Sequence, residues 1–115
     1  MSLESLPELI ITDLTVGSGK ETQKGALLLA HYEGTLNDGT VFDSSHVRGR
    51  PIEFVVGTGR VIKGWDQGLI GMREGGKRKL VIPAHLAYGE RAIGKIPPNS
   101  TLTFVIDLIE VRTRD

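Results

Sequence analysis

Short segments in which apolar and polar residues alternate make up much of this chain. The clearest is residues 102–108, where Leu102, Phe104, Ile106 and Leu108 alternate with mostly less apolar neighbours. A period of two is typical of a strand with one buried face. Similar runs, separated by glycine-rich turns, predict further strands over residues 9–14, 26–36, 41–44, 52–56 and 77–82.

One segment has the longer period of a helix. Ile62, Trp65, Leu69 and Met72 follow one another at spacings of three and four residues. This spacing places them on a single face of a short amphipathic helix. We expect the helix to end at the glycine pair 75–76, and we expect residues 83–98 to be irregular.

These elements predict an α+β fold. The Asp38-Gly39 pair indicates a tight hairpin between two of the strands, because both residues tolerate a positive φ. One helix cannot cover both faces of a sheet, so we predict a twisted antiparallel sheet of five to six strands wrapped around one short central helix. We expect residues 1–8 to be a flexible N-terminal segment and residues 9–115 to form a single domain.

Composition narrows the classes of function. Lys and Arg number 14, as do Asp and Glu, so the formal net charge is zero, which argues against a nucleic-acid partner. Without cysteine there is no disulfide or thiolate chemistry, and a reducing cytoplasm is the expected location. No apolar run approaches the roughly 20 residues that span a membrane. At this length we expect a monomer that does not associate with membranes.

Motifs for nucleotide, metal or hydrolytic chemistry are defective. Residues 71–77 have the spacing of a P-loop, but Arg78 replaces the Ser or Thr that would hold magnesium. Residues 89–95 have the same spacing but are followed by Ile96 and two prolines, and proline removes backbone donors. The three histidines show no recognised metal spacing. We therefore expect no cofactor and no metal.

Several aromatic and apolar segments occur in a characteristic order. They are residues 31–34 (HYEG), 41–45 (VFDSS), 61–65 (VIKGW), 87–89 (AYG) and 96–98 (IPP), followed by Phe104. In this set the chain closely resembles the FKBP family of peptidyl-prolyl cis–trans isomerases. The resemblance runs from about Leu9 to Val111, which is nearly the whole chain.

The resemblance implies a bent sheet wrapped on one helix, with Trp65 as the floor of a pocket. It implies that Asp43 and Tyr88 supply polar contacts at the rim, and that the Ile62 N–H donates to a bound carbonyl. Asp43, Tyr88, Phe42, Phe104 and Tyr32 are the expected catalytic residues. The expected binding residues are Tyr32, Phe42, Asp43, Ile52, Val61, Ile62, Trp65, Ala87, Tyr88, Ile96 and Phe104.

Several ligands follow from the same resemblance. They are peptides that contain X-Pro bonds, unfolded proteins, and macrolides such as tacrolimus and rapamycin. Some positions depart from the family's pattern: Ile52 stands where an aromatic residue is common, and Arg60 where an acidic residue is frequent. The loop 89–96 is slightly short and lacks a histidine often found there. We expect these differences to affect peptide selectivity and macrolide affinity.

Two alternatives to an isomerase remain open at this point. A non-catalytic module or chaperone could bind proline-containing segments in the same aromatic groove. A pure binder does not need Asp43 and Tyr88, whose presence favours the enzyme. The second alternative, a nucleotide-dependent enzyme, is supported only by the two defective P-loop motifs. Tyr32 fits a supporting role in which its hydroxyl bonds to Asp43.

Overall fold

The computed structural model describes residues 7–113 and contains six strands. Of the predicted flexible segment 1–8, residues 1–6 lie outside the described residues, while residues 7 and 8 are exposed and have no regular structure. In chain order the elements are β1 (Ile10–Thr15), β2 (Leu27–Thr35), β3 (Val41–Ser44), α1 (Ser45–Arg48), β4 (Ile52–Val55), α2 (Lys63–Gly68), β5 (Lys77–Ile82), the 3-10 turn η2 (Ala84–Leu86) and β6 (Leu102–Arg112).

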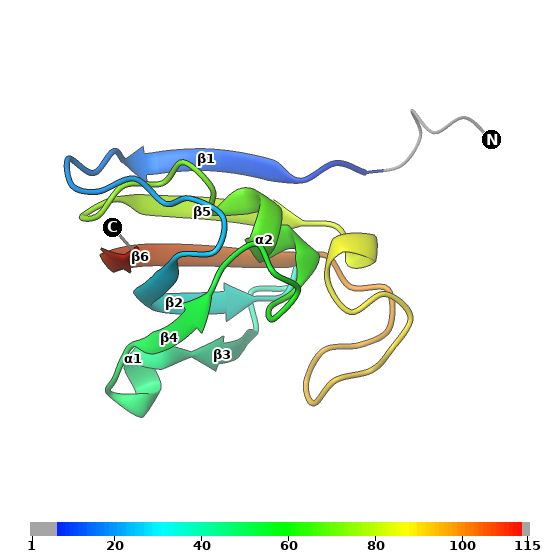
Figure 1. Cartoon of the computed structure of the whole chain (residues 1–115). Coiled ribbons are helices and arrows are strands. Elements are labelled where there is room, and N and C mark those ends of the chain that lie inside the picture. Colours follow the sequence, from blue (N-terminus) through cyan, green and yellow to red (C-terminus); the bar gives the residue numbers. More distant parts are fainter. Residues whose placement is uncertain (1–6, 114–115) are drawn as a thin grey trace.

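The strands form one antiparallel sheet in the order β1-β5-β6-β2-β3. Strand β2 also pairs with β4, so its two outer partners share one edge: β4 along residues 27–30 and β3 along residues 33–35. Figure 1 shows α2 in front of this sheet and the long loop between η2 and β6 beyond its end. The predicted fold class is confirmed, including the hairpin at Asp38-Gly39.

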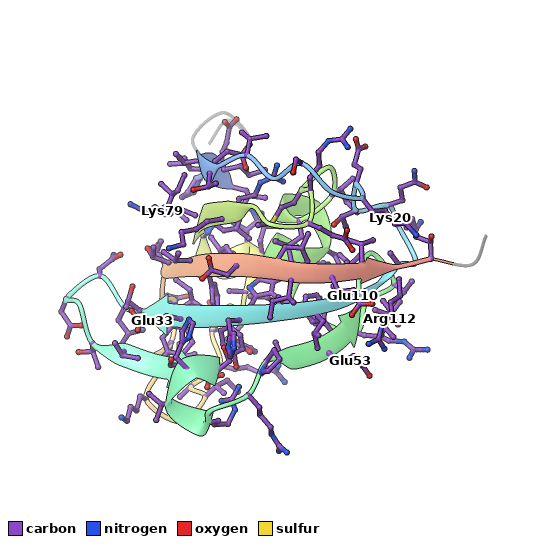
Figure 2. The ribbon with its side chains drawn as sticks, turned by 90° about the vertical axis from the view of Figure 1, so that its left-hand side faces the viewer. Lys20, Glu33, Glu53, Lys79, Glu110 and Arg112 are labelled. Carbon is purple, nitrogen blue, oxygen red and sulfur yellow. The ribbon has the colours of Figure 1, made fainter. Side chains whose placement is uncertain are left out.

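The alternation in β6 determines which face of the sheet is covered. Leu102, Phe104, Ile106 and Leu108 are all at least 96% buried and belong to the hydrophobic core. The opposite face carries polar side chains. Figure 2 shows Arg112 of β6 beside Glu53 and Glu110, both of which accept hydrogen bonds from its guanidinium group.

Two glycines allow α2 to lie close to the sheet. A Cβ atom on Gly64 would stand 2.4 Å from Ile82 Cγ2, and one on Gly68 would stand 2.8 Å from Leu80 Cδ2. Any larger residue would push the helix away from β5. Because Trp65 lies between these glycines, their close approach fixes how deeply its indole sits in the core.

The helix ends earlier than the apolar spacing predicts. Its last residue is Gly68, yet Leu69 and Met72 are at least 98% buried in the turns that follow. The apolar spacing from Ile62 to Met72 therefore reflects burial that continues beyond the end of the helix. Gly71 has φ +84°, which a right-handed helix cannot accommodate. The prediction that the helix continues to residue 75 is wrong.

A further helix of one turn, α1, lies where the sequence suggests only a polar loop. Its start is capped by the Ser44 hydroxyl, which accepts a hydrogen bond from the Val47 N–H, and its end by Gly49 at φ +77°. Four residues are too few to display a helical period. Within residues 7–113, no helix has the length and apolarity needed to cross a membrane.

Candidate functional site

An apolar pocket of about 270 Å³ opens between α2 and the strands beneath it. Its side chains come from four strands, from α2 and the three residues before it, and from the loop after η2. Segments far apart in the sequence therefore converge on one hollow. The lining residues are Tyr32, Phe42, Asp43, Ile52, Arg60, Val61, Ile62, Trp65, Tyr88 and Phe104.

Trp65 is the centre of the aromatic cluster below the pocket. Its ring centroid lies 5.2 Å from those of Tyr32 and Phe104, and 5.1 Å from that of Phe54. Phe42 meets Phe104 edge to face at 5.5 Å. Offset and edge-to-face pairs at such distances stabilise the cluster beyond simple burial. The indole is 4% exposed, so one side of it is core while the other contributes to the pocket.

Gly34 of β2 leaves the space that two of these rings occupy. A Cβ atom at this position would stand 2.5 Å from Phe42 Cζ and 2.8 Å from Phe104 Cε1. Strand β2 therefore lets both rings lie against its backbone.

Three polar side chains form a closed triangle at one side of the pocket. The Tyr32 hydroxyl donates to Asp43 Oδ2 at 2.5 Å, and Arg48 bonds to Asp43 Oδ1 at 2.5 Å and to the Tyr32 hydroxyl at 2.8 Å. The predicted contact between Tyr32 and Asp43 is confirmed. Arg48 also lies over the Tyr32 ring, 5.5 Å from its centroid.

The triangle keeps Asp43 ionised. Partial burial opposes ionisation, but hydrogen bonds from Tyr32 and then Arg48 outweigh it and hold the pKa of the carboxyl below its ordinary value. Burial, together with the hydrogen bond to Asp43, raises the pKa of the Tyr32 hydroxyl. The result is a fixed negative charge, partly neutralised by Arg48, at the edge of an apolar hollow.

Two hydrogen-bonding groups on the pocket wall have no partner among the described residues. Within residues 7–113, neither the Ile62 N–H nor the Tyr88 hydroxyl takes part in a hydrogen bond. The buried Trp65 Nε1 is also unpaired among these residues. Ile62 and Tyr88 are only partly buried and line the pocket, so these two wall groups are available to a ligand that enters it.

Comparisons with known proteins bear on what this pocket does. A family model described as FKBP-type peptidyl-prolyl cis-trans isomerase matches residues 18–109. The chain belongs to this FKBP family. Its members act on peptidyl-prolyl bonds, so the enzymatic class of the chain is peptidyl-prolyl cis–trans isomerase and its substrates contain proline.

Individual FKBP relatives agree with this assignment. The chain is 54% identical over 104 residues to an FK506-binding protein of Neisseria meningitidis serogroup A, covering 90% of this chain and 95% of the relative. It is 57% identical over 91 residues to FK506-binding protein 2 of Debaryomyces hansenii, covering 79% of this chain and 67% of the relative. The crystal structure of AtFKBP13 superposes with a TM-score of 0.85 at 48% identity, covering 91% of this chain and 93% of that structure.

Nine of the eleven predicted binding residues line the pocket of this FKBP domain. The exceptions are Ala87 and Ile96. Ala87 lines a neighbouring depression that shares Tyr88 with the pocket, and Ile96 is 95% buried in the hydrophobic core. Their predicted role in binding stays a prediction without a pocket contact.

Two further residues complete the site. Arg60, noted in the sequence only as a departure from the family's pattern, lines the pocket directly. Arg48 was missed, because four residues are too few to show the period of α1, the helix that carries Arg48 toward Asp43. The signals available in the sequence were Ser44 and Gly49, which cap this helix, and a basic residue five positions after Asp43.

Proposed function

We propose that this FKBP accelerates rotation about X-Pro bonds inside the pocket over Trp65, with no covalent step. The observation that carries the proposal is a converging apolar wall with two hydrogen-bonding groups, the Ile62 N–H and the Tyr88 hydroxyl, that have no partner within residues 7–113. An apolar wall weakens amide resonance, and the two polar groups can orient the twisted form.

The energies required match such a pocket. Rotation about a peptide bond faces a barrier of about 18–20 kcal/mol that arises from amide resonance. The planar amide is strongly dipolar, and much of that charge separation is lost at the twisted transition state. Removing an amide from water without a partner costs about 2–7 kcal/mol. A thousandfold acceleration needs only about 4 kcal/mol, so destabilising the planar ground state supplies an effect of the right size.

Each group has a distinct role in this proposal. The proline ring lies on the Trp65 indole between Phe42 and Phe104. The Ile62 N–H donates to a carbonyl of the bound peptide, and the Tyr88 hydroxyl bonds to the peptide at the rim. Asp43, fixed by Tyr32 and Arg48, provides a negative charge toward the twisting amide.

The same pocket supports wider proposals about ligands and biological role. Relatives of this chain are named FK506-binding proteins, and we propose that this chain also binds tacrolimus and rapamycin. We further propose that it assists protein folding on unfolded chains in the cytoplasm, since slow X-Pro exchange limits folding. Titration with tacrolimus and cell fractionation test the ligand and the location separately.

The test of catalysis is the isomerisation rate of a short X-Pro-Phe peptide. Wild-type protein should accelerate the exchange, and Asp43→Val and Tyr88→Phe should lower kcat/KM while circular dichroism shows an unchanged fold. A wild-type protein that leaves the uncatalysed rate unchanged would refute the proposal. If the variants weaken peptide binding but not the rate per bound peptide, Asp43 and Tyr88 serve only to bind the peptide.

A further inference from the structure

A second depression of about 630 Å³ adjoins the proline pocket. The two share the wall formed by Arg60, Val61, Ile62 and Tyr88. The second depression is strongly basic: Arg60, Lys63, His85 and Arg91 all line it, and all four are exposed. We call it the basic depression.

The arginine and lysine side chains of the basic depression have no carboxylate partner in the described part of the chain. Within residues 7–113, Arg60, Lys63 and Arg91 make no ion pair, and no Asp or Glu lines the basic depression. Asp66 of α2 is the nearest acidic residue in sequence to Lys63. Its carboxylate instead accepts hydrogen bonds from the Gly57 and Gly59 N–H groups.

Lys24, Arg50, Lys79 and Lys95 also make no ion pair within residues 7–113, so what distinguishes the basic depression is that its cations share one hollow that no carboxylate lines. Five other basic side chains each pair with a carboxylate; they are Arg48, Arg73, Lys77, Arg78 and Arg112. The chain as a whole has a formal net charge of zero. The excess positive charge beside the proline pocket is therefore local, and an anionic group placed there would meet three cations without displacing an internal partner.

We propose that the basic depression binds an acidic side chain next to the X-Pro bond, so that this FKBP prefers prolines flanked by Asp or Glu. The inference rests on the proposed function, since it assigns a substrate preference to the same pocket. An extended peptide advances about 3.3 Å per residue. Because the two hollows share a wall, a residue one or two positions from a proline over Trp65 falls within reach of the cations.

The preference is measured with peptides that differ at one position. One series places Glu, Gln or Lys directly before the proline, and a second places the same residues two positions after it. In at least one series, kcat/KM for Glu should exceed that for Gln by about threefold to tenfold at low ionic strength, as expected for two or three exposed ion pairs. The Lys peptide should be the poorest, and at about 1 M salt the Glu-to-Gln ratio should fall toward one.

A double variant tests whether the basic depression is responsible. Lys63→Gln with Arg91→Gln should bring the Glu-to-Gln ratio close to one. Lys79→Gln is the matched control: Lys79 follows the buried Arg78 and precedes the buried Leu80 in β5, so it lies on the opposite face of the sheet, where Figure 2 labels it. This control should keep the wild-type ratio.

The outcomes separate this inference from the proposed function. Equal rates for Glu, Gln and Lys peptides in both series overturn the substrate preference, even when every peptide is isomerised. A ratio that survives the double variant, or that Lys79→Gln abolishes as well, overturns the assignment to the basic depression. Absence of catalysis on the neutral Gln peptide is instead a failure of the proposed function.

Discussion

The shape of this pocket depends on small residues that leave space for their neighbours as well as on the side chains that line it. Gly34 contributes no side chain, yet Phe42 and Phe104 meet over its Cα, at the position where any other residue would place a Cβ. The two rings then close the wall that faces Trp65. The shape of the pocket therefore depends on the absence of a Cβ atom at Gly34 of β2.

Gly34→Ala should distort that wall. The added Cβ would displace both phenyl rings, and such overpacking typically lowers the free energy of unfolding by about 1–3 kcal/mol. Urea denaturation measures the loss, and the peptide assay should show a lower kcat/KM. Glu33→Ala is the control, since Glu33 is the exposed neighbour on the same strand, labelled in Figure 2. Equal stability of the two variants would contradict the steric argument.

Asp43 should make stability depend on acidity. Its pKa is lower in the folded chain than in the unfolded one, where the pKa of an Asp carboxyl is about 3.9. The unfolded chain therefore binds more protons in this range, so the contribution of Asp43 is present above that value and is lost as the pH falls through the folded pKa. Asp43→Asn should flatten the decline in free energy of unfolding between about pH 5 and pH 2. A decline as steep as that of the wild type would show that Asp43 does not contribute.

At the scale of elements, α2 depends on a residue of the sheet. Arg78 of β5 is 91% buried. One of its guanidinium nitrogens donates to the carbonyls of Gly68 at 2.9 Å and Ile70 at 3.1 Å, and another pairs with Asp13 of β1 at 2.7 Å. The last carbonyls of a helix have no partner within it. Arg78 thus closes the end of α2 and joins it to the outermost strand.

Arg78→Met should loosen this junction. It leaves two carbonyls and the Asp13 carboxylate without their donor, which we expect to lower the free energy of unfolding by about 2–4 kcal/mol. Asp13→Asn should cost less, because the Asp13 side chain is 40% exposed and Arg78 keeps both carbonyls. Thermal and urea denaturation compare the two variants. A larger loss from Asp13→Asn would show that the ion pair matters more than the helix end.

The elements that were predicted correctly are those in which the apolar pattern repeats over enough residues, or in which a turn has a characteristic residue pair. The alternation over 102–108 correctly located β6, and Asp38-Gly39 correctly located a hairpin. The end of α2 was predicted wrongly because Leu69 and Met72 are as buried in turns as they would be in a helix. Apolar spacing reports burial, whereas the end of the helix depends on Gly71 and on the distant Arg78.

At the scale of the molecule, the pocket is formed by residues that are spread along the chain from Tyr32 to Phe104. The resemblance to FKBP proteins placed Tyr32, Phe42 and Phe104 together, although their sequence positions alone do not. It did not identify Arg48, which reaches Asp43 only because α1 forms. It also did not show that Arg60 lies beside Lys63 and Arg91, because a net charge of zero conceals a local excess of cations.

The single tryptophan offers one reporter for the whole fold and for the pocket. Trp65 contacts rings from β2, β4 and β6 within one core, so its environment should change only when the sheet and α2 separate. Fluorescence and far-UV circular dichroism should therefore give coincident urea denaturation curves, as in two-state unfolding. Ligands that fill the pocket should alter the emission of the folded protein and raise the urea midpoint. An earlier fluorescence transition would show that α2 detaches from a sheet that is still folded, and would place the pocket outside the cooperative core.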